Sequence, residues 1–266
     1  IIFNASLSGD QVLALYQNRT DLIHSSMTEK DIEWNVTITP NDGFVDGETL
    51  SVGYLRILNS PVIHDDPLLN STLGTNLTSE NLTVYIVDPT DPDDDSYNNI
   101  VNWYRNGAPF NILNIPLEGE ESNLTSAKDY SGYNNNGSII LDGAGVGLTW
   151  NRTGGYDGGG SYEFDGIDDY IAINDQDMFD FEDENFTISL WMKSDADASI
   201  STAMRIIGKG RVGSDIGYDV YYQPSNDRIG FGDVSGSVYV SSLSVNDGNW
   251  HHIAVRYMQG NYYEIY

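Results

Sequence analysis

The stretch ENFTISLWMKS, residues 184–194, carries the clearest pattern in the chain. Every second residue along it is apolar, namely Phe186, Ile188, Leu190 and Met192. The residues between them are Thr187, Ser189, Trp191 and Lys193. Successive side chains of a strand point to opposite faces of its sheet, so this alternation predicts a strand that buries one face in a core. Similar short runs, separated by Gly, Asn and Asp clusters, occur at 158–173, 205–210, 217–223, 228–233, 237–242, 250–258 and 262–266. The sequence therefore predicts an all-β fold.

The composition excludes several classes of protein. The net charge is −28, from 40 acidic and 12 basic residues among 266, so the surface repels nucleic acid and anionic lipid. The chain contains no Cys, which excludes disulfides, a thiolate nucleophile and a Cys-based zinc site. No apolar run approaches the roughly 18 residues of a membrane span. With 39% hydrophobic residues, the chain is long enough for two or three globular domains.

N-x-S/T sequons are unusually frequent. There are ten where chance predicts roughly three or four, and they begin at Asn4, Asn18, Asn35, Asn70, Asn76, Asn81, Asn123, Asn136, Asn151 and Asn185. Asn and Thr are also ordinary turn and strand residues, which is the alternative explanation. We interpret the excess as the mark of an extracellular, cell-surface protein that carries N-linked glycans.

Four motifs follow one another in the second half of the chain. They are D-x-S-G-x-x-N-x-G at 129–137, F-D-G-x-D-D-Y-I at 164–171, F-T-I-S-L-W-M-K at 186–193 and V-N-D-G-N-W-H-H-I-A at 245–254. This order resembles the laminin-G-like, concanavalin A-like jelly roll, which implies a jelly-roll sandwich over residues 115–266. The resemblance also implies further strands beyond the equivalent of residue 266, followed by an ending of the form L-S-x-x-Q-[IV]-x-x-L-Y. We therefore expect the jelly roll at 115–266 to be incomplete at its C-terminal end.

The opening stretch IIFNASLSGDQVLALY, residues 1–16, matches that missing ending. Ser8 stands three residues before Gln11, the spacing of a capping box, and a helix starting there places Val12, Leu15 and Tyr16 on one face. We expect residues 1–20 to be the final strand and helix of a jelly roll and to complete a neighbouring copy. The side chains expected to be buried in that neighbour are Ile2, Phe3, Val12, Leu15 and Tyr16.

The middle of the chain resembles two halves of an immunoglobulin-like β-sandwich found in large archaeal and bacterial surface proteins. Residues 21–59, with Trp34 and the turn TPNDG, resemble its C-terminal half, and residues 60–114, with Trp103, resemble its N-terminal half. The halves stand in reversed order, and the resemblance implies that a laminin-G-like domain can be inserted between them. One ordinary seven-stranded sandwich over residues 21–113 is the alternative.

Two acidic clusters suggest calcium. Asp91, Asp93 and Asp95 alternate along DPTDPDDDSYNN at 88–99, but Ser96 and Asn102 stand where an EF-hand needs Gly and Glu, and a solvated loop is the alternative. The second cluster is Asp129, Asn134, Asn136, Asp165, Asp168 and Asp169. The resemblance implies Ca²⁺ near such loops, and ordinary turn formation is the alternative.

The sequence lacks a convergent catalytic motif, so we expect no enzyme. It contains no G-x-S-x-G, G-x-G-x-x-G or P-loop, and FDFEDENF at 179–186 lacks the E-x-D-x-x-E pattern of jelly-roll glycoside hydrolases. His251 and His252 adjoin in a predicted strand, where one faces in and the other out, which disfavours a metal pair. Trp191 and Trp250 fit core or sheet-face positions better than sugar platforms.

These observations predict an extracellular structural subunit of a glycosylated surface filament, sheath or S-layer. Its partners would be copies of itself, joined head to tail by strand or domain complementation, with Ca²⁺ at the joints. A carbohydrate-binding or cell-adhesion module is the alternative, because laminin-G-like domains commonly bind glycans and receptors.

Overall fold

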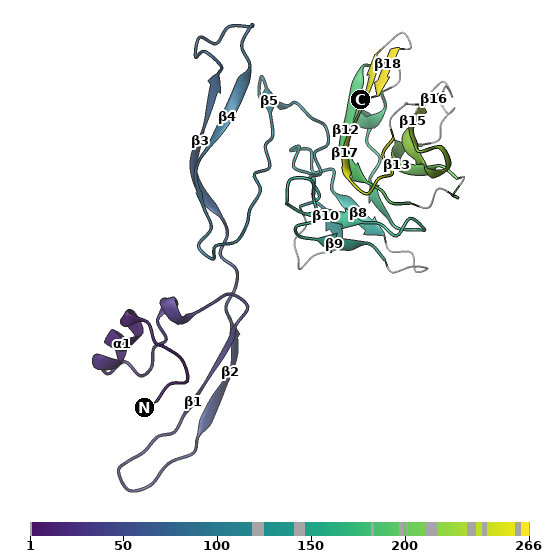
Figure 1. Ribbon diagram of the computed structural model, residues 1–266. Helices are drawn as coiled ribbons and strands as arrows, with labels where there is room; N and C mark the ends of the chain where they lie inside the picture. Colours follow the sequence, from purple (N-terminus) through teal and green to yellow (C-terminus); the bar gives the residue numbers. More distant parts are fainter. Residues whose placement is uncertain are drawn as a thin grey trace. The chain divides into compact units, whose positions relative to one another are not determined.

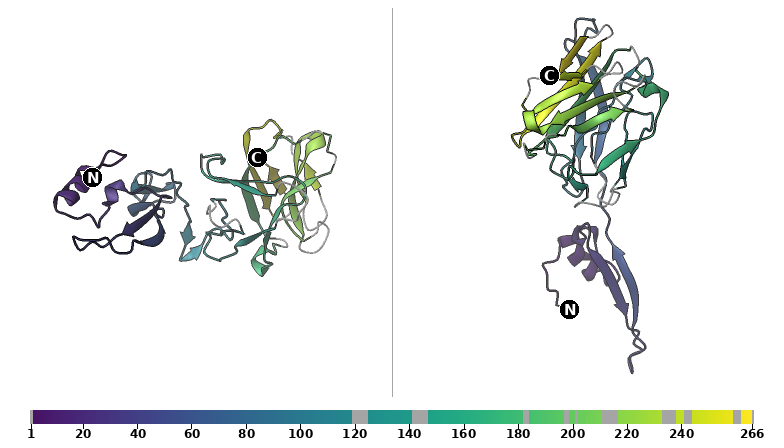
Figure 2. Two further views of the ribbon diagram at one scale, coloured as in Figure 1. Left: turned by 90° about the horizontal axis from the view of Figure 1, so that it is seen from below. Right: turned by 90° about the vertical axis from the view of Figure 1, so that its right-hand side faces the viewer.

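The computed structural model describes residues 2–118, 125–140, 147–181, 184–196, 199–200, 202–210, 217–232, 238–240, 244–258 and 262–265. The chain divides into two units, Ile1–Asn98 and Asn99–Tyr266 (Figures 1 and 2). Most regular elements are strands, which confirms the predicted β class. No helix among the described residues is long and apolar enough to cross a membrane.

Unit 1 holds one α-helix and four strands. Its elements are α1 (Gly9–Tyr16), the 3-10 helix η1 (Ser25–Met27), β1 (Glu33–Ile38), β2 (Leu50–Arg56), β3 (Ile63–Ser71) and β4 (Leu82–Thr90). Strands β1 and β2 form one antiparallel hairpin, and β3 and β4 form another. Each hairpin is a separate two-stranded sheet, not part of one seven-stranded sandwich.

Helix α1 begins where the sequence predicts it. The Ser8 hydroxyl accepts the backbone N–H of Gln11 at 3.1 Å, and Asn18 closes the helix in the left-handed conformation at φ 62°. Gln11 is buried, and its side-chain amide is paired with the backbone on both sides. Its Nε2 donates to the Leu22 carbonyl at 3.0 Å, and its Oε1 accepts the His24 N–H at 2.7 Å. The face of α1 that packs on its own chain is therefore the one with Gln11 and Ala14, not the one with Val12 and Tyr16.

Unit 2 contains the remaining strands. They are β5 (Tyr104–Arg105), β6 (Ala108–Pro109), β7 (Ser126–Ala127), β8 (Gly137–Ile140), β9 (Thr149–Asn151), β10 (Ser161–Glu163), β11 (Tyr170–Ile173), β12 (Phe186–Lys193), β13 (Met204–Lys209), β14 (Tyr218–Gln223), β15 (Arg228–Gly232), β16 (Val238–Val240), β17 (Trp250–Met258) and β18 (Tyr262–Ile265). Short 3-10 helices lie at Asp177–Phe179 (η2) and Pro224–Asn226 (η3). Residues 99–114, which the sequence groups with an immunoglobulin-like half, fall in this unit.

The core of unit 2 lies between two antiparallel sheets. One sheet has the order β12-β17-β18 and the other β13-β14-β15-β16, and both contribute to one cluster of buried side chains. Val220, Ile229 and Phe231 of the second sheet are wholly buried. The apolar residues of β12 pack against them from the first sheet, as the alternation at 186–193 predicts. This two-layer arrangement is consistent with a jelly-roll sandwich.

Trp103 differs from its expected position. It precedes β5 and is 37% exposed, whereas the resemblance to an immunoglobulin-like domain places it in a sandwich core. Its carbonyl accepts the N–H of Phe110 at 2.8 Å across the β5–β6 hairpin. Strands β5 and β6 form a two-stranded sheet, and no third strand joins it among the described residues.

Candidate functional site

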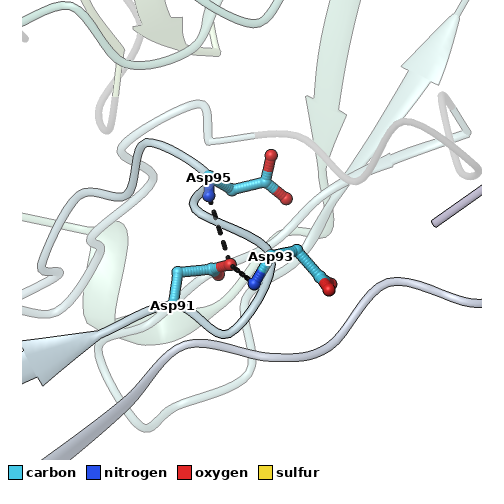
Figure 3. Close-up of side chains that lie close together, drawn as sticks. All are labelled: Asp91, Asp93 and Asp95. Carbon is cyan, nitrogen blue, oxygen red and sulfur yellow. Dashed lines mark hydrogen bonds between the residues drawn. The ribbon is translucent and has the colours of Figure 1, made fainter. Parts of the chain in front are cut away.

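The first acidic cluster forms a turn after β4 (Figure 3). One oxygen of the Asp91 carboxylate accepts the N–H of Asp93 at 2.8 Å and of Asp95 at 3.2 Å. Asp93 in turn accepts the N–H of Ser60 at 2.6 Å, and Asp95 forms an ion pair with Lys30. The three carboxylates do converge, with oxygens within 4.8 Å of one another. Their hydrogen bonds nevertheless give them a structural role, which is to join β4 to the segments at 30 and 60.

Asp129 holds its loop together through hydrogen bonds. It is buried, and its two oxygens accept hydrogen bonds from the Asn114, Ser131 and Asn135 N–H groups and from the Ser131 hydroxyl, all between 2.6 and 2.9 Å. Burial alone would raise the pKa of Asp129, but these hydrogen bonds outweigh burial and lower the pKa. Both oxygens of the Asp129 carboxylate therefore already accept hydrogen bonds. Asp129 also lies outside the group of converging carboxylates formed by Asp165, Asp168 and Asp169.

Asp165, Asp168 and Asp169 form the second converging cluster, in the turn before β11. Each offers a carboxylate oxygen within 4.8 Å of the other two. Asp165 uses one oxygen to accept the N–H of Ile167 at 2.8 Å, while its other oxygen is buried with no hydrogen-bond partner in the part of the chain that the structure describes. Hard oxygen ligands of this kind fit Ca²⁺, so the donor set is chemically suited to that ion.

An aromatic stack lies on the outer face of the β12–β17–β18 sheet. Trp191 of β12 points away from the core, and its indole stacks on Tyr156 with ring centroids 3.4 Å apart and planes 11° apart. Both rings remain accessible, Tyr156 at 56% and Trp191 at 42%. His252, the cross-strand partner of Trp191, lies 5.1 Å from the indole centroid and forms a 2.9 Å hydrogen bond with Ser189. We name Tyr156, Trp191, His252 and Ser189 the aromatic platform.

The loop between β9 and β10 holds Tyr156 in place. Gly155 donates its N–H to the Gly159 carbonyl at 2.8 Å, and a Cβ at Gly155 would lie 2.6 Å from the Gly160 carbonyl oxygen. Only glycine therefore fits this tight turn. Trp250 donates its indole N–H to the Gly154 carbonyl at 3.2 Å and ties the loop to β17. The Tyr156 ring is thus presented from a fixed loop.

The sequence pattern predicts the positions of Trp191, His251 and His252 on their strands, although it disfavours a sugar platform at Trp191. His251 and His252 do alternate: His252 is exposed beside Trp191, while His251 is half-buried and bonds Asp247 at 2.9 Å. Trp191 lies on the sheet face, as expected, and Trp250 serves as a hydrogen-bond donor. Tyr156 was missed, although a single aromatic residue in the glycine-rich loop TGGYDGGG is the signal that could have found it.

The sequon asparagines fall on the surface. Nine are described and all nine are exposed: Asn4, Asn18, Asn35, Asn70, Asn76, Asn81, Asn136, Asn151 and Asn185. Asn123 lies outside the described residues. Asn136 also accepts the Asp129 N–H at 2.8 Å through its side-chain oxygen, which leaves its amide nitrogen available for other bonds.

The proposed assembly residues are also largely uncovered. Ile2 is 99% exposed and Tyr16 is 87% exposed, while Phe3 and Val12 are about half exposed and Leu15 is half-buried. The face formed by Val12 and Tyr16 is therefore open to solvent within one chain.

Comparison with known proteins supports the interpretation of unit 2. Residues 164–266 match the laminin-G-type family described as the concanavalin A-like lectin/glucanases superfamily. The match includes β11 to β18 and three of the four sequence motifs. No curated protein and no solved structure matches the chain.

Proposed function

We propose that unit 2 binds glycans, as a carbohydrate-binding or cell-adhesion module. The observation that carries this proposal is the exposed aromatic platform, on a sheet whose sequence matches a superfamily that includes lectins. Flat aromatic rings pack against the C–H face of a pyranose, and nearby polar groups bond its hydroxyls. Here the ring is Tyr156, and His252 and Ser189 are the neighbouring polar groups.

Preorganisation favours this surface over an ordinary exposed tyrosine. Trp191 backs the Tyr156 ring and the glycine turn fixes its loop, so little side-chain freedom remains to be lost when a sugar binds. Many exposed aromatic residues lack such support. The outward face of the ring is the expected contact.

A glycan array followed by calorimetry tests the proposal. The wild-type chain should bind selected glycans in the micromolar range, and Tyr156→Ala should weaken binding at least tenfold. Tyr170→Ala is the matched control, because Tyr170 is similarly exposed at 51% but lies on β11. Equal binding by both variants would move the site elsewhere, and no binding by the wild type would reject the function. Release of reducing sugar would indicate a glycan hydrolase instead.

Ca²⁺ forms the second part of this proposal. Asp165, Asp168 and Asp169 would hold the ion, because their oxygens converge and one Asp165 oxygen is buried without a partner among the described residues. A bound Ca²⁺, with charge +2, would offset most of the −3 charge of the three carboxylates and stiffen the segment that leads into β11.

An extracellular location and N-glycosylation complete the proposal. Support comes from the ten sequons and from the exposure of the nine described asparagines. In protein isolated from its native source, peptides that contain the sequon asparagines should therefore carry excess mass, and enzymatic removal of N-linked glycans should abolish that excess. Unmodified sequon peptides in the native protein would contradict this part.

A second function, a structural subunit that assembles with copies of itself, is favoured by a different observation. Ile2 precedes α1, Val12 and Tyr16 lie one turn apart on it, and all three side chains are more than half exposed, as expected for a donated segment. The double variant Val12→Ser, Tyr16→Ser should weaken self-association in sedimentation experiments, whereas Gln17→Ser on the same helix end should not. If both variants associate like the wild type, residues 1–18 are not the donor.

A further inference from the structure

The outer face of the β12–β17 strand pair extends beyond the aromatic platform. The two strands lie side by side and antiparallel (Figure 1), and their residues alternate between the core and the outer face. Ile253 and Val255 of β17 belong to the buried core, so the residues next to them point outward. The outward residues form the cross-strand pairs Lys193–Trp250, Trp191–His252, Ser189–Ala254 and Thr187–Arg256. We name these four pairs the outer track.

The outer track places one cation on each side of the platform. Successive pairs are roughly 7 Å apart, because two residues of a strand rise by that distance. Lys193 therefore stands one step from Trp191 in one direction, and Arg256 stands two steps from His252 in the other. The small side chains of Ser189 and Ala254 lie between His252 and Arg256. A ligand longer than one sugar that is seated on Tyr156 would thus reach a cation towards either end.

The outer track differs in charge from the chain as a whole. The chain has a net charge of −28 and 12 basic residues, yet the track contains two of these, Lys193 and Arg256, and none of its residues is acidic. Lys193 is exposed and has no ion-pair partner in the part of the chain that the structure describes. The Arg256 side chain is 51% exposed and donates from Nη1 to Glu264 at 3.2 Å. Because a guanidinium has five N–H donors, Arg256 can hold both Glu264 and an anionic ligand.

Three acidic residues adjoin the track in sequence or by strand pairing, and each has a partner. Glu264 of β18 pairs with Arg256. Asp247 bonds His251 at 2.9 Å, and Asp157, next to Tyr156, accepts the Gly159 N–H at 3.1 Å. Charges separated by more than about 8 Å are largely screened at physiological salt. The local cations, rather than the net charge of the chain, therefore determine the electrostatic potential over the track.

We propose that the outer track selects anionic oligosaccharides. One sugar ring packs on Tyr156, and Lys193 and Arg256 bind carboxylate or sulfate groups of the sugars on either side of it. Arg forms paired hydrogen bonds with such groups, and Lys attracts them as a point charge. This inference rests on the proposed glycan-binding function and names the class of glycan for the same site.

Matched sets of oligosaccharides test this selectivity on the full chain. The probes are uronate oligomers of several backbones, their carboxyl-reduced neutral forms, and sulfated derivatives of the neutral forms. In calorimetry, at least one anionic oligomer should bind roughly tenfold more tightly than its neutral form, because the neutral form lacks the charge-assisted contacts. Raising the salt concentration from about 50 to about 500 mM should reduce this preference, since salt screens exposed charges. A preference for the uronate or for the sulfated form identifies the anion that the two cations hold.

Variants assign the selectivity to the two cations. Lys193→Gln and Arg256→Gln should each lower the preference for the anionic oligomer roughly threefold, whereas Lys193→Arg, which retains the charge, should keep it. Glu264→Gln should raise the preference, because Arg256 then loses its ion pair with a carboxylate of the protein. Arg205→Gln is the matched control and should bind like the wild type. The Arg205 side chain is 50% exposed and ion-paired with Asp219, but it belongs to β13 in the other sheet.

The possible failures of this inference and of the proposed function differ. Equal binding of anionic and neutral forms, both dependent on Tyr156, would overturn the selectivity and leave the glycan-binding function in place. Failure of every probe and of the glycan array would reject that function itself. A preference that survives in both Lys193→Gln and Arg256→Gln, or that Arg205→Gln lowers equally, would overturn the assignment to the outer track. Single-stranded DNA bound as tightly as the anionic oligomer would also overturn it, since any polyanion would then suffice.

Discussion

Strands β1 and β12 have the same alternating pattern but opposite environments. Both place apolar side chains at every second position, and both pair with an antiparallel neighbour. In unit 2 a second sheet covers the apolar side of β12, so Val220, Ile229 and Phe231 are wholly buried opposite it. In unit 1 the apolar side of β1 faces solvent, with Val36 and Ile38 more than half exposed. The alternating pattern therefore predicts which face of a strand is apolar. Whether that face is buried depends on a second sheet packing against it.

The largest expected difference between the units comes from deleting one phenyl ring in each. Phe231→Ala should destabilise unit 2 by about 3–5 kcal/mol, because it leaves a cavity in a closed core. Phe44→Ala, at 97% exposure in the tip of the β1–β2 hairpin, should change stability by less than about 0.5 kcal/mol. Urea denaturation followed by circular dichroism measures both. Comparable losses in the two variants would break the contrast between a closed and an open unit.

Ca²⁺ should distinguish the two acidic clusters. At a concentration of about 100 times its dissociation constant, Ca²⁺ should stabilise unit 2 by about 2.7 kcal/mol, which corresponds to a rise in melting temperature of roughly 5–10 °C. Asp165→Asn should abolish the shift, because it removes the carboxylate whose buried oxygen has no hydrogen-bond partner among the described residues. Asp91→Asn should retain the shift, since Asp91 already accepts two backbone N–H groups. Chelation with EGTA provides the reference, and a shift lost only in Asp91→Asn would reverse the assignment.

Local signals in the sequence predict local structure well. The strand at 186–193, the Ser8 cap of α1 and the opposite directions of His251 and His252 all follow from spacing alone, and the structure confirms them. Contacts between distant segments were harder to predict. The bonds of Asp129 to Asn114, of Ser60 to Asp93 and of Trp250 to Gly154 link segments 15 to 96 residues apart.

Turn composition explains why the acidic sites were only partly predictable. Asp and Asn favour turns for local reasons, so their presence does not distinguish the two sites. The Asp129 carboxylate accepts hydrogen bonds within its loop, whereas one buried oxygen of Asp165 has no partner in the part of the chain that the structure describes. The packed side of α1 was likewise not predictable from the sequence, because it contains the polar residue Gln11. The side-chain amide of Gln11 can be buried because it forms hydrogen bonds with two distant backbone groups. These outcomes depend on tertiary contacts that no local pattern encodes.

A smaller effect compares two strand glycines. A Cβ at Gly230 of β15 would lie 2.1 Å from the ring of its cross-strand partner Tyr221, so Gly230→Ala should destabilise unit 2 by about 1–2 kcal/mol. A Cβ at Gly53 of β2 would meet no atom within 4 Å, so Gly53→Ala should be neutral within about 0.5 kcal/mol. Thermal denaturation of the two variants gives the comparison. A tolerated Gly230→Ala would mean that the Tyr221 ring swings away at little cost.

The smallest expected effect is the acid titration of one turn aspartate in each unit. The hydrogen bond from His251, together with the N–H of Asn249, lowers the pKa of Asp247 to about 2, and backbone N–H bonds from Val45 and Phe44 also lower the pKa of Asp42. Because the folded pKa of Asp247 lies below the ordinary 3.8, its stabilisation is fully present above about pH 4 and is lost as the pH falls towards 2.

Carbon-13 NMR titration of the carboxyl groups should resolve these two aspartates. His251→Ala should raise the pKa of Asp247 part of the way towards 3.8, because the Asn249 N–H bond at 2.9 Å remains. Asp42 serves as the internal control, since its partners belong to a separate turn in unit 1. An unchanged pKa of Asp247 in His251→Ala would mean that backbone hydrogen bonds alone lower it, as they do for Asp42. The two turns would then lower the pKa of their aspartates in the same way.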